Sequence, residues 1–205
     1  FNAITGIERI AAGRIAFEGR DITAMPVHRR ALLGISRTFQ ITNLFPTLTV
    51  AENMQLALRG TEASKFSLFG STQLNEDDNA RVAQALSISR LGARTAVAVH
   101  ELSYGEQRQL EMAMALVAQP RLLLLDEPAA GLSPAERVSA ADIIRSLPRD
   151  LTMVLIEHDM ELALKLVDWV TCLNNGQMLA EGSPQSISAD QRVQDVYLGK
   201  ARGHA

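Results

Sequence analysis

Two adjacent carboxylates, Asp126 and Glu127, follow directly after the apolar run Leu122 to Leu125. A short apolar run that does not alternate with polar residues is typical of a strand buried on both faces of a parallel sheet. Ligands of such sheets bind beyond the carboxyl ends of the strands, which is where these side chains stand. One carboxylate could hold a magnesium ion there, and the other could orient and polarise a water molecule. Taken alone, however, this pattern is more typical of a solvated turn.

A second candidate site lies upstream in LSYGEQ, residues Leu102 to Gln107. Ser103 and Glu106 have the spacing of a capping box, which predicts that a helix begins there. The free N–H groups and the positive dipole end of that helix suit an anion, and Gly105 lets the backbone approach it closely. An ordinary capped helix explains Ser103 and Glu106 as well.

Strands and helices are predicted around both sites. We expect Met153 to Ile156 to form a second strand buried in a parallel sheet, and Ile35 to Gln40 to form another strand. Residues 44–118 should be mostly helical. Further helix starts are predicted by the cap residues Thr49 with Glu52, Asn75, and Ser133 with Glu136 and Pro134.

Glycines mark several predicted ends and turns. Gly6 should end a helix over Phe1 to Thr5, and Gly92 should end the helix that starts at Asn75. A Gly-containing turn within Gly13 to Ile22 predicts a short antiparallel strand pair. Asn175-Gly176 predicts a hairpin between Val170–Asn174 and Gln177–Glu181.

The composition argues against several classes of protein. With 205 residues, 47% of them hydrophobic and 21% charged, the chain can bury a core as one domain with a subdomain. A net charge of −3 provides no bulk attraction to nucleic acid. The single cysteine, Cys172, cannot form an intrachain disulfide, and we expect a small buried hydrophobe in a reducing compartment. The longest apolar run, Met112 to Ala118, is far shorter than the roughly 18 residues of a membrane span, so membrane association is expected through a partner.

The two sites together resemble a known family. LSYGEQ is similar to the signature motif of the ATP-binding cassette (ABC) ATPases, and LLLLDEP, residues Leu122 to Pro128, is similar to their Walker B strand with its catalytic glutamate. An isolated capped helix would not account for the order and distance of these motifs. The commonest signature form is LSGGQ, so Tyr104 and Glu106 are departures that indicate a subfamily variant.

This resemblance implies roles for the residues of both sites. Asp126 would hold Mg²⁺, usually through water, and Glu127 would orient the water that attacks the γ-phosphate of ATP. The signature residues Ser103, Tyr104, Gly105 and Glu106 would bind the ATP held by a second subunit.

Four more residues take roles only by resemblance. Gln40, which follows ISRTF, matches the Q-loop glutamine that contacts Mg²⁺ and water, and His158 matches the switch histidine that reaches the γ-phosphate. Gly131 and Ser133 lie at the position of the D-loop, where many members carry aspartate in place of Ser133. On their own, Gln40 is typical of a surface side chain and a lone histidine is typical of a structural role.

The implied fold is a P-loop NTPase-like α/β ABC core with a mainly parallel sheet, a small antiparallel β part and a helical subdomain. Residues 1–43 and 119–205 would form the core, and 44–118 the helical subdomain with the signature motif. The phosphate loop G-x-x-x-x-G-K-[ST], or Walker A, is not among the 205 residues. FNAITG resembles what directly follows GKTT in this family. We therefore expect the sequence to be truncated at its N-terminus and to lack the first strand and the loop.

Longer stretches resemble the ATPase subunits of branched-chain amino-acid importers, notably RTFQITNLFPTLTVAENMQLAL and NNGQMLAEGSPQSISADQRVQDVYLG. The implied assembly has two ATPase subunits, identical or paralogous, under two transmembrane permease subunits at the cytoplasmic face of the bacterial inner membrane, supplied by a periplasmic substrate-binding protein. In related transporters the region of Leu44, Phe45, Pro46 and Leu48 forms part of a groove for a coupling helix of the permease. Urea and amide importers, a lipopolysaccharide exporter and a non-catalytic interaction fragment are the alternatives.

We predict that the 205 residues alone bind ATP weakly or not at all, because the amides and the lysine of a phosphate loop supply most of the polar contacts to the β- and γ-phosphates. Calorimetric titration with Mg-ATP measures this. A dissociation constant in the low micromolar range would contradict the prediction.

Overall fold

The computed structural model describes residues 1–38, 44–60 and 74–198, and it divides into two compact units, Phe1–Val154 and Leu155–Ala205. The first unit is built around a sheet whose strand order is β3 (Ile35–Arg37), β4 (Leu122–Asp126), β5 (Thr152–Ile156). The last two residues of β5 belong to the second unit.

The central strand β4 is buried as its apolar sequence predicts. β3 runs parallel to it, with Ile35 opposite Leu122 and Arg37 opposite Leu124. Residues Leu123 to Leu125 are fully buried. The prediction of complete burial is wrong for β5, whose side chains alternate between exposed and half-buried, because β5 is the last strand in the order of this sheet. The mixed α/β class with a parallel sheet is confirmed.

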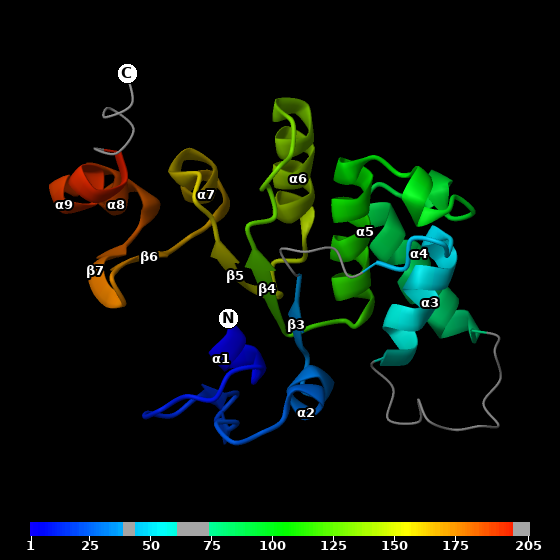
Figure 1. The fold of residues 1–205 in the computed structure, drawn as a ribbon, viewed down its shortest axis with the longest axis horizontal. Coiled ribbons are helices and arrows are strands. Elements are labelled where there is room, and N and C mark those ends of the chain that lie inside the picture. Colours follow the sequence, from blue (N-terminus) through cyan, green and yellow to red (C-terminus); the bar gives the residue numbers. More distant parts are fainter. Residues whose placement is uncertain (39–43, 61–73, 199–205) are drawn as a thin grey trace. The chain divides into compact units, whose positions relative to one another are not determined.

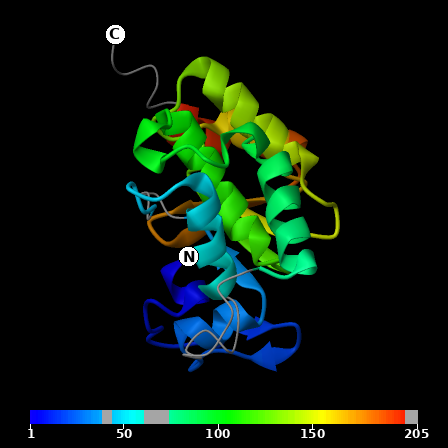
Figure 2. The same cartoon turned by 90° about the vertical axis from the view of Figure 1, so that its right-hand side faces the viewer.

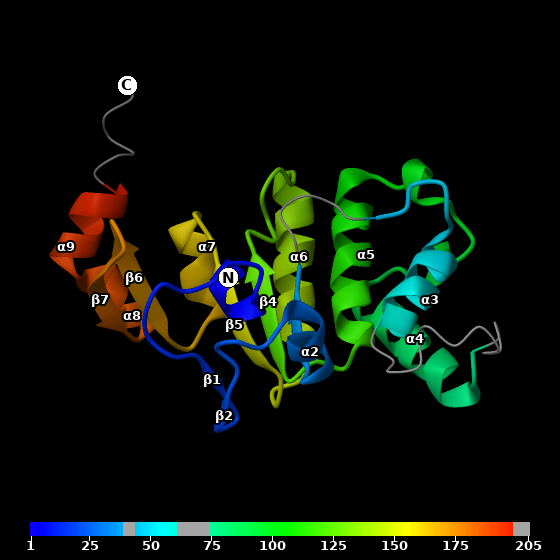
Figure 3. The ribbon, with the colours of Figure 1, turned by 60° about the horizontal axis from the view of Figure 1, so that its bottom comes forward.

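The N-terminal part of this unit contains α1 (Asn2–Thr5), the antiparallel pair β1 (Ala16–Phe17) and β2 (Arg20–Asp21), and α2 (Val27–Leu32) (Figure 3). Gly6 ends α1 in the left-handed conformation, as predicted, and the strand pair lies within the predicted range.

Four α-helices of the first unit begin at the predicted caps: α3 (Val50–Gly60), α4 (Glu76–Ile88), α5 (Tyr104–Val117) and α6 (Pro134–Ser146). The 3₁₀ turns η1 (Gly92–Arg94) and η2 (Val99–Glu101), which were not predicted, lie between α4 and α5. Helices α3, α4 and α5 pack against one another (Figures 1 and 2). The predicted stop at Gly92 is wrong: α4 already ends at Ile88, since Arg90 takes a left-handed conformation, and Gly92 begins η1. The predicted boundaries of a helical subdomain, 44–118, stay a prediction.

The second unit contains α7 (Met160–Leu166), the antiparallel hairpin β6 (Val170–Asn174) and β7 (Gln177–Gly182), α8 (Pro184–Ala189), α9 (Gln191–Val193) and the π-helical turn η3 (Gln194–Leu198). Asn175 and Gly176 both have positive φ, which confirms the predicted hairpin turn. Cys172 is buried with Ala180, Ile187 and Val193, and this burial raises the pKa of its thiol. The predicted role of Cys172 as a buried hydrophobe is confirmed. No helix within the described residues is long and apolar enough to cross a membrane.

One buried arginine holds the N-terminal part of the first unit together. Arg30 of α2 donates from Nη1 to the carbonyl oxygens of Ala3 (2.7 Å) and Ile4 (2.8 Å) at the end of α1. Its Nη2 donates to Thr23 O (2.9 Å) and its Nε to Met25 O (2.8 Å). The guanidinium therefore supplies the donors that the last carbonyls of α1 lack within the helix.

We predict that Arg30→Met lowers the free energy of unfolding by about 3 kcal/mol, because it leaves partly buried carbonyl groups without their charged donor. Urea unfolding followed by circular dichroism measures the change. The control is Arg29→Met, which removes an exposed arginine from the same helix. Equal effects of the two substitutions would contradict a structural role for Arg30.

Candidate functional site

Asp126 ends β4 in an ion pair that the sequence analysis did not anticipate. Its Oδ2 lies 2.6 Å from Nη2 of Arg37 on the neighbouring strand, and the two side chains are only 17% and 12% exposed. The Asp126 N–H donates to Thr38 Oγ1 at 3.4 Å, and the Thr38 N–H donates to Leu124 O at 3.0 Å. Asp126 is therefore held from the side chain and from the backbone by the end of β3.

Arg37 also connects Asp126 to the start of the chain. Its Nη1 donates to Asn2 Oδ1 at 2.6 Å, and its guanidinium carbon lies 5.5 Å from the centre of the Phe1 ring. Arg37 is a charged residue on a strand that lies beside a buried strand, so its side chain needs a partner. The arginine in ISRTFQ was therefore the signal from which an ion pair could have been predicted.

Glu127 adopts an unusual backbone conformation. Its φ is +47°, a left-handed value that is uncommon for a residue with a side chain. Such a conformation costs on the order of 1–3 kcal/mol and is found at functional sites, where surrounding contacts maintain it. Here the N–H of Ala130 donates to Glu127 O at 3.0 Å and closes a tight turn. The turn directs the chain away from the sheet and leaves the Glu127 side chain half-buried just beyond Asp126.

The start of α5 forms the predicted capping box. The Ser103 N–H donates to Glu106 Oε2 at 2.9 Å, and the Glu106 N–H donates to Ser103 Oγ at 3.2 Å. The bond from the Ser103 backbone is the largest cause that lowers the pKa of Glu106, and Arg94, 2.8 Å from its Oε1, lowers it further. Glu106 is thus held ionised against the positive end of the helix.

The start of α6 packs directly on the start of α5. Glu136 accepts hydrogen bonds from the N–H (2.9 Å) and the Oγ (2.6 Å) of Ser133, and these bonds, with a weaker one from the Gly105 backbone, lower its pKa. Gly105 is buried, and a methyl group on it would overlap the Glu136 carboxylate. A larger residue at this position would therefore have to displace the Glu136 side chain from its place against the start of α5. The sequence analysis assigned Glu136 only to the cap of α6.

Of the other predicted site residues, Tyr104 lies in the first unit, His158 lies in the second, and Gln40 is not described. Tyr104 lies against Gly131, in the turn that follows Glu127. His158 is exposed and belongs to the second unit, just before Asp159, which caps α7 through the N–H of Leu162 at 3.0 Å. Gln40 lies outside the described residues. The structure thus brings Asp126, Glu127, the start of α5 and the turn at Gly131 to one part of the first unit.

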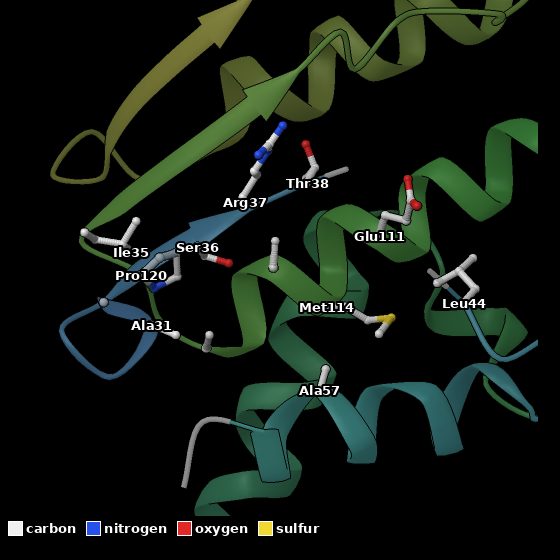
Figure 4. Close-up of a pocket in the computed structure, with 13 residues that line it drawn as sticks. Ala31, Ile35, Ser36, Arg37, Thr38, Leu44, Ala57, Glu111, Met114 and Pro120 are labelled. Atoms are coloured by element: carbon white, nitrogen blue, oxygen red, sulfur yellow. The ribbon is translucent and has the colours of Figure 1, made fainter. Parts of the chain in front are cut away.

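A cavity of about 250 Å³ lies between β3 and the helices of this unit (Figure 4). Arg37 and Thr38 reach it from the strand side, and Glu111 and Met114 of α5 from the helix side. Residues that hold Asp126 therefore share this cavity with residues of the helix that begins at the capping box.

The described residues include no group of three His, Cys, Asp or Glu side chains that could enclose a metal ion. Mg²⁺ does not require such a group, because it is commonly held by one or two carboxylates together with phosphate oxygens and water. The adjacent carboxylates of Asp126 and Glu127 fit that smaller donor set. Beside this donor set, the ion pair with Asp126 holds the positive charge of Arg37 in a fixed place.

Comparisons with known proteins identify the family of the chain. A family model described as ABC transporter matches residues 1–130, and one described as branched-chain amino acid ATP-binding cassette transporter matches residues 177–202.

Similar proteins include the high-affinity branched-chain amino acid transport ATP-binding protein BraF of Pseudomonas aeruginosa, 34% identical over 98% of this chain and 82% of the relative. The corresponding protein LivG of Escherichia coli is 35% identical with the same coverage. A crystal structure of an ATP-binding cassette of an ABC transporter in its ADP conformation superposes with a TM-score of 0.79 at 28% identity, over 97% of this chain and 81% of that one. A nucleotide-free cassette gives a TM-score of 0.76 at 28% identity, over 96% and 81%.

Proposed function

Because the chain belongs to the ABC transporter family, we propose that it is an ATPase subunit that powers the import of branched-chain amino acids. The observation that carries the proposal is the end of β4, where Asp126 and a conformationally restrained Glu127 lie next to the packed starts of α5 and α6. The substrate class is supported by the match of residues 177–202 and by the names of the relatives, since the site itself is suited to the nucleotide and not to the cargo.

The residues of the first unit divide the chemistry between them. Asp126, fixed by Arg37 and Thr38, would provide an oxygen ligand for Mg²⁺, which neutralises phosphate charge when it is bound. Glu127 would orient a water molecule toward the γ-phosphate of ATP, and by the family resemblance Gln40 and His158 would also take part in hydrolysis. Holding Glu127 in its turn keeps its carboxylate aimed without reorganisation during the reaction.

The start of α5 would face a second copy of the site. Ser103, Tyr104, Gly105 and Glu106 form a capped helix start, which suits the γ-phosphate of the ATP held by a second ATPase subunit. Gly131 and Ser133 of the adjoining turn would lie at the same dimer contact. The assembly would contain two ATPase subunits and two membrane permease subunits, with a periplasmic substrate-binding protein, and place this chain at the cytoplasmic face of the membrane.

A docking segment for the permease is supported by the residues that precede α3. The Phe45 N–H donates to Asn53 Oδ1 at 2.9 Å, and Asn53 Nδ2 donates to Phe45 O at 3.1 Å. Asn53 is fully buried, so the backbone of Phe45 is fixed while the residue is 51% exposed. An exposed aromatic residue on a fixed backbone is a suitable anchor for the apolar face of a partner helix.

Substitutions of the two carboxylates test the proposed chemistry in a protein in which these residues follow a phosphate loop. Glu127→Gln should keep nucleotide binding and lower steady-state ATP hydrolysis by roughly 100-fold or more, because the water is no longer polarised. Asp126→Asn should instead weaken magnesium-dependent nucleotide binding. Turnover of Glu127→Gln at the natural rate would refute its role, and identical phenotypes would refute the division of labour.

The docking segment is tested by Phe45→Ser in the assembled transporter. We expect reduced co-purification with the permease and reduced transport, with the melting temperature and the ATPase activity of the isolated subunit near those of the natural protein, because the ring is half-exposed. Leu56→Ser is the matched control, since Leu56 is an exposed apolar residue of α3 at 39%. A collapse of stability would show that Phe45 is core, and unchanged binding and transport would place the dock elsewhere.

A further inference from the structure

We propose that Tyr104 is a positioning residue for Glu127, acting through the backbone of Ala130. This inference rests on the proposed ATPase function, and it assigns a role to a side chain that the commonest signature sequence, with glycine at this position, does not have. The contacts that carry it all lie within the first unit.

The Tyr104 ring packs on the turn that follows Glu127. Gly131 in that turn has a φ of +74°, and a methyl group built on it would lie 3.1 Å from Tyr104 Cε1 and 3.4 Å from the hydroxyl oxygen. These distances are tighter than ordinary van der Waals contact. Both the left-handed backbone and the nearby tyrosine therefore favour glycine at 131. The absence of a side chain there leaves room for the Tyr104 ring against the turn.

The Tyr104 hydroxyl has a defined direction. Arg108, one turn further along α5, brings Nε to 3.2 Å and Nη2 to 2.9 Å from the hydroxyl oxygen. A guanidinium can only donate, so the hydroxyl accepts from Arg108 and its own hydrogen is available to an acceptor elsewhere. Ala130 O lies 3.5 Å away and accepts that hydrogen in a long, weak bond, beyond the roughly 3.0 Å limit of ordinary O–H···O bonds.

Arg108 is itself fixed on α5. Its Nη1 lies 2.9 Å from Glu111 Oε2, and both side chains are 8% exposed. Burial would lower the pKa of Arg108, but the hydrogen bond and charge of Glu111 and the hydroxyl of Tyr104 outweigh it and raise that pKa. A buried, paired guanidinium has little freedom to turn, so it holds the Tyr104 hydroxyl in one place.

The contacts end at the backbone of Glu127, the proposed catalytic residue. Ala130 accepts from Tyr104 through its carbonyl, and its N–H donates to Glu127 O at 3.0 Å. The carbonyl oxygen of Ala130 is therefore bonded to α5, and its N–H is bonded to the strained residue Glu127. A residue with a left-handed φ keeps that conformation only while surrounding contacts hold it. Arg108 and Tyr104 provide such contacts from a different helix, through Ala130 of the turn itself.

Tyr104→Phe tests this role, because it keeps the ring on Gly131 and removes only the hydroxyl. The loss of a long, weak hydrogen bond predicts a fall in kcat for ATP of about 2- to 5-fold, with KM for ATP changed by less than about 2-fold. The assay uses the natural protein in its assembled transporter. Tyr197→Phe is the matched control, since Tyr197 is the other tyrosine of the chain and its hydroxyl donates to Leu173 O at 2.7 Å in the second unit. It should leave kcat and KM unchanged.

Two further measurements separate this inference from the proposed function. In the Glu127→Gln background, Tyr104→Phe should cause no further loss of kcat, because the group that it positions is already gone. Amide hydrogen exchange over 128–132 should accelerate in Tyr104→Phe and not in Tyr197→Phe, whether or not the protein hydrolyses ATP.

Equal effects of the two tyrosine substitutions on kcat, or unchanged exchange over 128–132, would overturn the positioning role. A fall in kcat of the same size in the Glu127→Gln background would overturn it as well. Natural turnover in Glu127→Gln alone would instead overturn the proposed ATPase chemistry.

Discussion

The burial of the middle of β4 is the constraint on which the site depends. Leu123, Leu124 and Leu125 are inaccessible to solvent, so no charged side chain could be accommodated along the strand without a partner. The first carboxylates can appear only where the strand ends, and Asp126 and Glu127 occupy that point. The catalytic chemistry proposed for the chain is therefore placed by the packing of apolar side chains that take no part in it.

Around that strand end, charged and polar groups fix the geometry from three directions. Arg37 and Thr38 hold Asp126 from the neighbouring strand, and Arg37 also contacts Asn2 and Phe1 at the start of the chain. Tyr104 contacts the turn beyond Glu127 from α5. The residues proposed for nucleotide binding are thus connected to one another by polar contacts, each made by a side chain that is itself anchored by burial or by a second bond.

The start of α5 has a double role in this arrangement. Its capping box gives the helix a defined first turn, and its buried Gly105 allows α6 and Glu136 to approach closely. A change in this first turn would affect α6 and the Glu127 turn, because Glu136 and Ala130 both contact it. Coupling of this kind requires only neighbouring contacts and no long pathway.

The sequence by itself determined the elements whose signals are local. Apolar run length predicted β4, Ser-x-x-Glu spacing predicted the starts of α5 and α6, and Asn175-Gly176 predicted the hairpin, because each depends on bonds between residues close in the chain. The family resemblance added roles for Asp126, Glu127 and the signature residues.

Tertiary structure alone decided that Arg37 pairs with Asp126, 89 residues away, and that Tyr104 contacts Ala130. It also decided that β5 is half-exposed, since the cover of a strand depends on its neighbours in the sheet and not on its own residues. Contacts between distant segments leave no periodic pattern in either segment, and so only the folded chain shows which charged side chain finds which partner.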